Sequence, residues 1–300
     1  MDGKKINAPI NTITDALPHI SESRRIIRVM ASRKVVVVGA VIIFIMVLVA
    51  IFAPLLAPYD PYKTNLKEYL QPVSKTHWLG TDNSGRDTLS RIIYGSRTSL
   101  MVGFVSIFIA SSIGMLLGLT AGYYGGAYGA VVMRFIDALM AFPMILMALV
   151  IAALLGGGIT NVIIAIGISL TALYARLMHG QVLSIKENDY VTASRAMGAR
   201  NALIMFRHVF PNCMPPMIVL ITMQLGSAIL AEAGLSFLGI GIAPPGASWG
   251  SMVSDGYKYL LDLPVLSFAP GIAIMLIVFA FNMVGDGLRD ALDPRLRGTI

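Results

Sequence analysis

Six long stretches of this chain are apolar and nearly free of charge, and polar segments separate them. A helix needs about 20 apolar residues to cross the hydrocarbon core of a bilayer. The first stretch is longer than the apolar core of a signal peptide, and no small-residue cleavage site is recognisable, so we expect it to be retained. The pattern predicts an all-α integral membrane protein with about six transmembrane helices, at residues 35–56, 98–123, 130–155, 159–174, 214–242 and 268–284.

The polar segments between these stretches predict the topology. Basic residues of membrane proteins gather on the cytoplasmic side, and most of the 23 Lys and Arg lie in the tail 1–34, in the segment 176–207 and near the C-terminus. A shorter external loop is expected at 243–264. The remaining parts are a cytoplasmic N-terminal tail at 1–34, an external loop at 57–97, a transmembrane core at 98–284 and a cytoplasmic C-terminal tail at 285–300.

The external loop 57–97 contains charged residues of both signs. A turn is expected at Asp82 or Asn83, and residues 87–94 have the pattern of a short amphipathic helix lying along the membrane surface. Neighbouring acids and arginines can form an acid/base or metal cluster, but nothing in the sequence places the carboxylates at a common site. We expect a solvated ion-pair network, formed by Asp82, Asp87, Arg86 and Arg91.

Glycines recur every four residues in the second apolar stretch, at Gly114, Gly118 and Gly122. This spacing places them on one helix face, where a second helix can approach closely. The segment 123–129 is also rich in glycine, but it lacks the lysine and the Ser or Thr of a phosphate-binding loop. We therefore expect a helix-packing face, and no ATP hydrolysis by this chain.

Two acidic residues lie within apolar stretches, and ionisable groups at membrane depth are candidates for function. Asp137 follows Arg134 by three residues, a spacing that predicts an ion pair on one helix face near the cytoplasmic boundary, with a transport role as the alternative. Glu232 has small neighbours, which predicts a broken or tilted helix beside a water-filled cavity. Its carboxylate either lines a path or holds neighbouring helices through hydrogen bonds.

The segment 180–212 interrupts the apolar pattern with six charged residues and must lie in water. Asn188 or Asp189 can cap a first short helix by accepting a hydrogen bond from a free backbone N–H. Gly198 ends this helix, because glycine adopts the left-handed conformation at no steric cost. Residues with helical spacing fall on one face of the helix, and these are Tyr190, Ala193 and Met197.

A second short helix is predicted directly after the first. Asn201 can cap it, and Leu203, Phe206 and Phe210 form a stripe along it. Pro211 ends it, because proline lacks the N–H that would continue the hydrogen-bond ladder. We call residues 186–211 the elbow. A pair of short helices that projects from the membrane suits insertion into a groove on a soluble partner.

The composition and the remaining motifs exclude several classes of protein. The chain is 56% hydrophobic and 13% charged, whereas about a quarter of the residues of a soluble protein are charged. Four histidines stand far apart without metal-ligand spacing, and no nucleophile has a recognisable base beside it. The single cysteine excludes an internal disulfide. No basic module with aromatic residues suggests nucleic-acid binding. We expect neither an enzyme nor a metal site.

The elbow contains three small residues, then a glycine, and ends in a proline; the residues of this arrangement are Thr192, Ala193, Ser194, Gly198, His208, Phe210 and Pro211. It resembles the cytoplasmic loop of permease subunits of ABC importers, which reads Glu-Ala-Ala, three residues, Gly, nine residues, Ile-x-Leu-Pro. Gly198 and Pro211 keep that spacing. Thr192, Ser194 and His208 depart from it in the way that is typical of the peptide and nickel branch.

Two further segments, 77–100 and 229–250, are similar to the corresponding parts of dipeptide and oligopeptide permeases. The resemblance extends from about residue 32 to residue 297 and is closest to the C-type subunit of these importers. It implies that the elbow couples the chain to ATPase subunits, through Tyr190, Thr192, Ala193, Ser194, Arg195, Met197, Gly198 and Pro211.

The same resemblance implies a location and a set of partners. These are the bacterial cytoplasmic membrane, a homologous permease subunit that completes a heterodimer, two ATP-binding cassette subunits that hold ATP and Mg²⁺, and an external substrate-binding protein. Di- and oligopeptides are the implied cargo, with nickel, glutathione, opines and antimicrobial peptides as alternatives inside the family. The alternative outside the family is an ion-coupled secondary transporter that uses Glu232 and Asp137.

Overall fold

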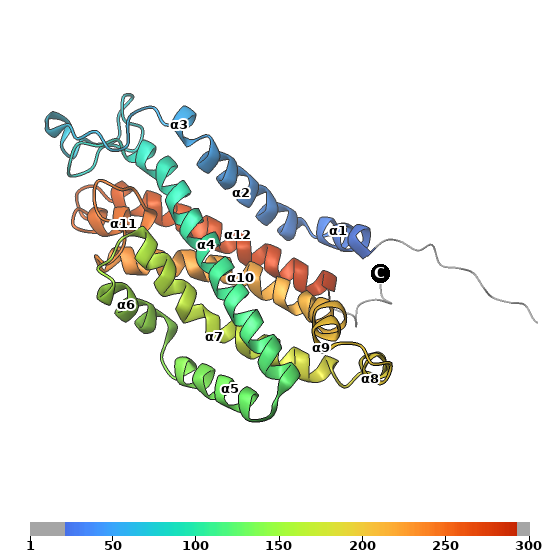
Figure 1. Cartoon of the computed structure of the whole chain (residues 1–300). Coiled ribbons are helices and arrows are strands. Elements are labelled where there is room, and N and C mark those ends of the chain that lie inside the picture. Colours follow the sequence, from blue (N-terminus) through green and yellow to red (C-terminus); the bar gives the residue numbers. More distant parts are fainter. Residues whose placement is uncertain (1–21, 293–300) are drawn as a thin grey trace, which may run out of the picture.

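The computed structural model describes residues 22–292, and all regular elements in this part of the chain are helices. Four long helices, packed side by side, form the body of the molecule (Figure 1). They are α4 (Thr88–Tyr124), α7 (Ile159–Ile185), α10 (Phe210–Phe237) and α12 (Val265–Leu292). Together with α2 (Lys34–Ile51), they are long and apolar enough to cross a membrane. In this count α10 includes the helical residues directly before it, from Asn201 on. The predicted all-helical membrane fold is confirmed.

The glycines of the second apolar stretch pack α4 against α7. A Cβ atom added to Gly114 would lie 2.5 Å from the carbonyl oxygen of Thr171, and one added to Gly122 would lie 2.9 Å from the Cβ of Val182. One added to Gly118 would lie 2.8 Å from the Cβ of Met178. These distances leave no space for side chains, so the predicted packing face is confirmed.

The amphipathic helix predicted at 87–94 is not a separate element, and that prediction was wrong. Residues 88–124 form one helix of 37 residues, capped by the Asp87 carboxylate, which accepts a hydrogen bond from the backbone N–H of Ser90 at 2.8 Å. The helix is not broken between the predicted amphipathic segment 87–94 and the predicted span 98–123. Gly95 packs against the ring of Trp249, where an added Cβ would be only 3.0 Å from the indole.

The third predicted span, 130–155, is broken into two helices, α5 (Gly126–Met140) and α6 (Met144–Leu154), which are bent by 90°. The break lies at Pro143, which has an extended ψ of 131° and cannot donate to the hydrogen-bond ladder. By length and composition the described chain therefore contains five spans, or six if the bent pair counts as one.

The remaining segments are more helical than their sequence predicts. The first predicted span consists of α2 and, after Phe52, the short α3 (Ala53–Leu56), while α1 (Glu22–Ser32) lies within the predicted tail. The loop expected at 243–264 contains α11 (Trp249–Tyr257), and α12 continues past residue 285. The tail residues 1–21 and 293–300 lie outside the described residues.

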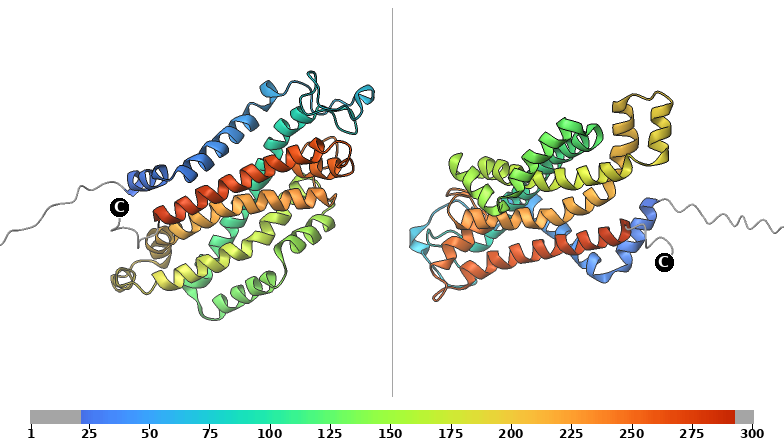
Figure 2. Two further views of the ribbon diagram at one scale, coloured as in Figure 1. Left: turned by 180° about the vertical axis from the view of Figure 1, so that it is seen from behind. Right: turned by 90° about the horizontal axis from the view of Figure 1, so that it is seen from below.

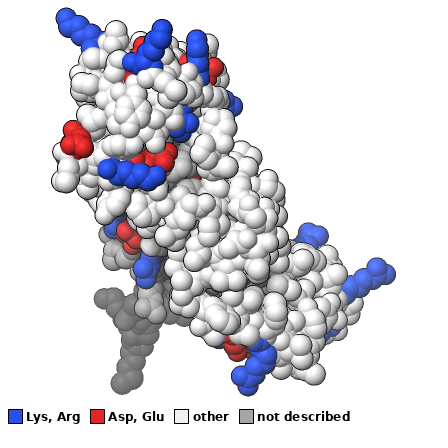
Figure 3. Space-filling model, turned by 90° about the vertical axis from the view of Figure 1, so that its left-hand side faces the viewer, with Lys and Arg blue, Asp and Glu red and all other residues white. Residues whose placement is uncertain are grey.

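The long helices give the molecule two distinct ends (Figures 1 and 2). The segment 57–87 and α11 lie at one end, which we call the loop end. The elbow and α1 lie at the other, which we call the elbow end. Figure 3 shows charged side chains at the top of the view, along its left side and at its right and lower edges, with a broad uncharged surface in the middle. This distribution is typical of a chain whose middle contacts lipid.

Candidate functional site

The elbow presents a helix, α8 (Asp189–Ala196), with a surface of small and apolar side chains. Tyr190 and Met197 are 44% and 81% exposed, and Ala193 is exposed between them at helical spacing. Thr192 and Arg195 are exposed beside them. The side chains expected on one face therefore do share an open surface.

Ser194 differs from the other predicted coupling residues because its side chain faces inward. It is 9% exposed, and its hydroxyl donates a hydrogen bond to the carbonyl oxygen of Tyr190 at 2.7 Å. Val191 is fully buried on the same inner side. Both side chains lie on the inner face of α8, so any partner surface consists of the other face.

The ends of α8 follow the predicted positions. Asn188 is the N-cap residue, although its side chain makes no capping bond and its amide donates to the carbonyl oxygen of Ile185 at 3.0 Å instead. Gly198 follows the helix with a φ of +82°, a conformation that residues with a Cβ rarely adopt. The predicted stop at Gly198 is confirmed.

The second elbow helix does not end at Pro211, and this prediction was wrong. Helical residues begin at α9 (Asn201–Leu203), continue through a π-helix (Ile204–Val209) and enter α10 without a break. In the wider π turn, the N–H of Phe210 bonds the carbonyl oxygen of Met205, five residues back. A π-bulge disrupts the normal ladder at this point, so the missing N–H of Pro211 is tolerated. The elbow thus continues into α10 without a break.

Two side-chain contacts fasten the elbow to the end of α4. The hydroxyl of Tyr123 donates to Oδ1 of Asn201 at 3.1 Å, where the second elbow helix begins. The ammonium of Lys186 donates to the carbonyl oxygen of Gly122 at 3.1 Å, just before the first. The elbow is therefore attached to α4 on both sides of α8, and it also continues directly into α7 and α10.

Glu232 of α10 is fully buried inside the bundle. Its carboxylate accepts hydrogen bonds from Ser99 of α4 at 3.0 Å and from Ser236 at 2.7 Å. Ser248, directly before α11, lies 3.4 Å from the Ser236 hydroxyl. The carboxylate thus lies where α4, α10 and the start of α11 meet. α10 continues unbroken past Glu232, so of the predicted broken or tilted helix the broken form is wrong.

Asp137 of α5 has a different partner from the one its sequence spacing predicts. It forms an ion pair with Arg176 of α7, and not with Arg134. Both side chains are partly exposed, at 40% for Asp137 and 49% for Arg176. The pair joins two helices that are distant in sequence, which an i to i+3 pattern cannot reveal.

The charged cluster at the loop end is buried, whereas a solvated network was predicted. The side chains of Arg86 and Arg91 are 6% and 3% exposed, and Asp82 pairs with both, at 2.7 Å and 3.3 Å. Asp87 binds the ring of His77 at 2.8 Å. Segment 57–87 folds over the start of α4 and covers these groups. The turn predicted at Asp82 is present, because the N–H of Gly85 bonds the Asp82 carbonyl at 2.9 Å.

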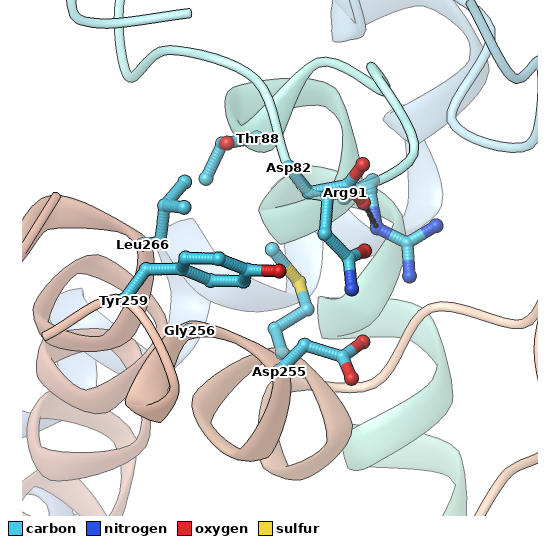
Figure 4. Close-up of a pocket in the computed structure, with 9 residues that line it drawn as sticks. Asp82, Thr88, Arg91, Asp255, Gly256, Tyr259 and Leu266 are labelled. Atoms are coloured by element: carbon cyan, nitrogen blue, oxygen red, sulfur yellow. Dashed lines mark ion pairs between the residues drawn. The ribbon is translucent and has the colours of Figure 1, made fainter. Parts of the chain in front are cut away.

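Arg91 joins the two loop-end segments. Its guanidinium donates to the carbonyl oxygens of Pro61 at 3.0 Å, Pro245 at 3.3 Å and Gly246 at 3.4 Å. Figure 4 shows a pocket beside it, between the start of α4 and α11, with Asp82, Asp255 and Tyr259 in its wall. The pocket has a volume of about 20 Å³, which suits a single water and excludes a peptide. Between residues 22 and 292, no group of three His, Cys, Asp or Glu side chains is placed to hold a metal ion.

Residues 114–298, more than half of the chain, match the family model for the binding-protein-dependent transport system inner membrane component. The chain belongs to this family. Residues 21–72 also match the N-terminal transmembrane domain of oligopeptide transport permease C. The resemblance of the sequence to permeases of ABC importers is therefore confirmed. The chain is a multi-pass protein of the inner membrane.

Several relatives in this transport family match nearly the full length of the chain. The dipeptide transport system permease protein DppC of Alkalihalophilus pseudofirmus is 42% identical over 283 residues, which are 94% of this chain and 93% of the relative. The oligopeptide permease OppC of Bacillus subtilis is 42% identical over 89% of this chain and 87% of its own. The glutathione transport permease GsiD of Pectobacterium atrosepticum is 40% identical, with 88% of each chain covered.

Among solved structures, an inward-facing form of the MetNI methionine ABC transporter aligns with a TM-score of 0.55. The alignment covers 68% of this chain and 96% of that chain at 19% identity. At this level of identity the likeness concerns the fold alone. The helical bundle described above therefore shares its fold with a chain of that transporter.

Sequence reasoning missed the residues that fasten the elbow and those that hold Glu232. Tyr123 and Asn201 are 78 residues apart, and Ser99 and Glu232 are 133 apart. One weak signal was present, because Tyr123 lies immediately after the last glycine of the α4 packing face. Because α4 and α7 are close together at Gly122, the hydroxyl of the following tyrosine is well placed to reach the elbow, which follows α7.

Proposed function

We propose that this chain is a permease subunit of an ATP-driven importer of dipeptides and oligopeptides, and that it docks on an ATP-binding cassette subunit through α8. The observation that carries the docking role is the exposed face of α8 on an elbow that is fastened to α4 and continuous with α7 and α10. Movement of this elbow displaces three long helices together, which is the requirement for rigid-body switching. The names of the DppC and OppC relatives support peptides as the cargo.

The partners follow from the same proposal. A homologous permease completes the pathway, two cassette subunits bind and hydrolyse ATP with Mg²⁺, and an external binding protein delivers the cargo. The elbow end and both termini then face the cytoplasm, and the loop end faces outward. Segment 57–97 meets the binding protein or plugs the pathway, and deletion of residues 63–74 tests this role by measuring delivery from that protein.

Two alternatives make different predictions. Glutathione is favoured as cargo by one relative, the GsiD protein, and competition between labelled dipeptide and glutathione separates the two cargos. An ion-coupled secondary transporter would use Glu232 and Asp137. The contacts of these residues favour structural roles. Serine hydroxyls donate hydrogen bonds to the carboxylate of Glu232, and Arg176 forms an ion pair with that of Asp137.

The experiment that tests the function is uptake of a labelled dipeptide into membrane vesicles that contain the chain, its neighbouring subunits and the binding protein. We expect uptake that requires ATP and the binding protein and persists when the proton gradient is collapsed. We also expect Glu232→Gln to retain ATP-dependent uptake. Uptake that follows the proton gradient, and that Glu232→Gln abolishes without loss of the inserted protein, would replace the importer by a secondary transporter.

A further inference from the structure

The corner where α1 meets α2 at the elbow end forms an open apolar groove. The chain turns at Arg33, which has an extended backbone with φ −97° and ψ 107°. The groove has a volume of about 410 Å³. Its walls consist only of apolar side chains from both helices, namely Ile27, Met30, Ala31, Val36, Val37, Ala40, Val41 and Phe44.

The helix α1 is held in place to form this groove. Val29 is buried, the guanidinium of Arg25 donates to the carbonyl oxygen of Ala291 at 3.3 Å, and Arg33 forms an ion pair with Asp290. These contacts attach α1 to the end of α12. Ile27 nevertheless stays 66% exposed on the groove side, and Phe44 is 63% exposed at the far end. The groove is thus a fixed feature whose apolar wall is uncovered.

Basic side chains border the groove where the apolar span begins. Lys34 is exposed and lies in a neighbouring pocket that shares Val36 with the groove and also contains Asp286. Arg28 is exposed and precedes Ala31 by three residues on α1. The uncharged residues of α2 start directly after Lys34, which places these two cations at the depth of lipid headgroups. Asp286 and Asp290 lie near the same corner, and Asp290 is already paired with Arg33.

We propose that this corner is a binding site for one anionic phospholipid. An acyl chain lies along the groove, and the headgroup phosphate binds near Arg28 and Lys34. A short helix that combines arginines with exposed apolar residues, as α1 does, is typical of elements that lie in the membrane interface. The groove continues into the exposed apolar face of α2, where Val38 and Ile45 are 51% and 52% exposed, so lipid reaches it directly from the bilayer. The site is independent of the cargo and of the proposed coupling.

The test is native mass spectrometry of the complex of this chain with its co-expressed partner subunits, mixed with phosphatidylglycerol and phosphatidylcholine that carry identical acyl chains. Wild type is expected to retain phosphatidylglycerol preferentially. Arg28→Gln with Lys34→Gln should weaken its apparent affinity about five-fold for each charge removed. The matched control, Lys67→Gln with Lys75→Gln, removes two exposed charges at the loop end and should leave the preference unchanged.

A second variant tests the groove itself. Ala40→Trp fills it and should reduce retention of both lipids without changing their ratio. Equal retention of the two lipids by wild type, or an equal loss in the loop-end control, would overturn the proposal. A photo-crosslinker at position 40 that labels a partner chain and no lipid would overturn it too. If the double variant does not assemble, the two single variants provide the same comparison.

Discussion

The hydroxyl of Tyr123, at the end of α4, donates a hydrogen bond to Oδ1 of Asn201, where the second elbow helix begins, at 3.1 Å. Together with the bond from Lys186 to the carbonyl oxygen of Gly122, it connects the elbow to a helix that is far from it in sequence. α4 packs along α7 through its glycine face and, at Ser99, reaches Glu232 of α10. We therefore expect a displacement of the elbow to reach α4, α7 and α10.

Removing this hydroxyl should weaken coupling without preventing assembly. A neutral hydrogen bond contributes about 0.5–1.5 kcal/mol, so Tyr123→Phe should lower the peptide taken up per ATP hydrolysed by about two- to ten-fold. The measurement is the ratio of uptake to ATP hydrolysis in vesicles. Tyr128→Phe is the control, because that hydroxyl contacts Thr120 and not the elbow. Equal effects of the two variants would show that the contact with Asn201 is irrelevant to coupling.

The contact between α4 and α7 should not accept a methyl group at Gly118. An alanine there would bring its Cβ to 2.8 Å from the Cβ of Met178, and overpacking costs about 1–3 kcal/mol. Gly118→Ala should lower the unfolding temperature of the purified subunit in detergent. Gly271→Ala, on α12, has no atom within 4 Å of the added Cβ and should leave that temperature unchanged or raise it. The prediction fails if both substitutions have the same effect.

The buried carboxylate of Glu232 should contribute to stability through its hydrogen bonds. Glu232→Gln keeps the shape and still accepts hydrogen bonds, so its free energy of unfolding should change little. Glu232→Ala leaves the hydroxyls of Ser99 and Ser236 without their acceptor and opens a cavity, at a cost of about 2–5 kcal/mol. Denaturant titration of the purified subunit measures both. Ser169→Ala, which removes a bond within a single helix, is the control.

At the loop end, Arg91 should hold segment 57–87 against the segment before α11. Loss of one partner from a buried charge pair costs about 3–5 kcal/mol, so Arg91→Ala should release the loop and expose it to protease. Lysine cannot reproduce the several directed donors of the guanidinium, so Arg91→Lys should give a similar result. Limited proteolysis, followed by mass spectrometry, locates the cuts. Arg97→Ala removes an exposed arginine further along α4 and should leave the loop protected.

The sequence predicts the elements of this fold that depend on local composition. Apolar length reveals the helices, the four-residue spacing of Gly118 and its neighbours reveals a packing face, and Gly198 reveals the stop after α8. Each of these signals acts within a few turns of a helix, where side-chain spacing and backbone conformation are determined locally.

The features that the sequence does not predict depend on tertiary context. Pro143 bends the third span, whereas Pro211 lies in a continuous helix, because a π turn disrupts the ladder only at the second site. Asp137 pairs with Arg176 across two helices, and segment 57–87 buries charges that look solvated in sequence. Local spacing contains no information on these long-range contacts.

The coupling role of α8 is tested most directly by placing a charge on its exposed face. Ala193→Arg should abolish ATP-driven dipeptide uptake and the stimulation of ATP hydrolysis by the binding protein, because a large charged side chain blocks insertion into a groove on the cassette subunit. Ala127→Arg places the same side chain at an exposed position of α5, off the elbow, and should leave both activities intact. Both variants must be inserted at wild-type levels. Normal uptake with Ala193→Arg would contradict docking through α8.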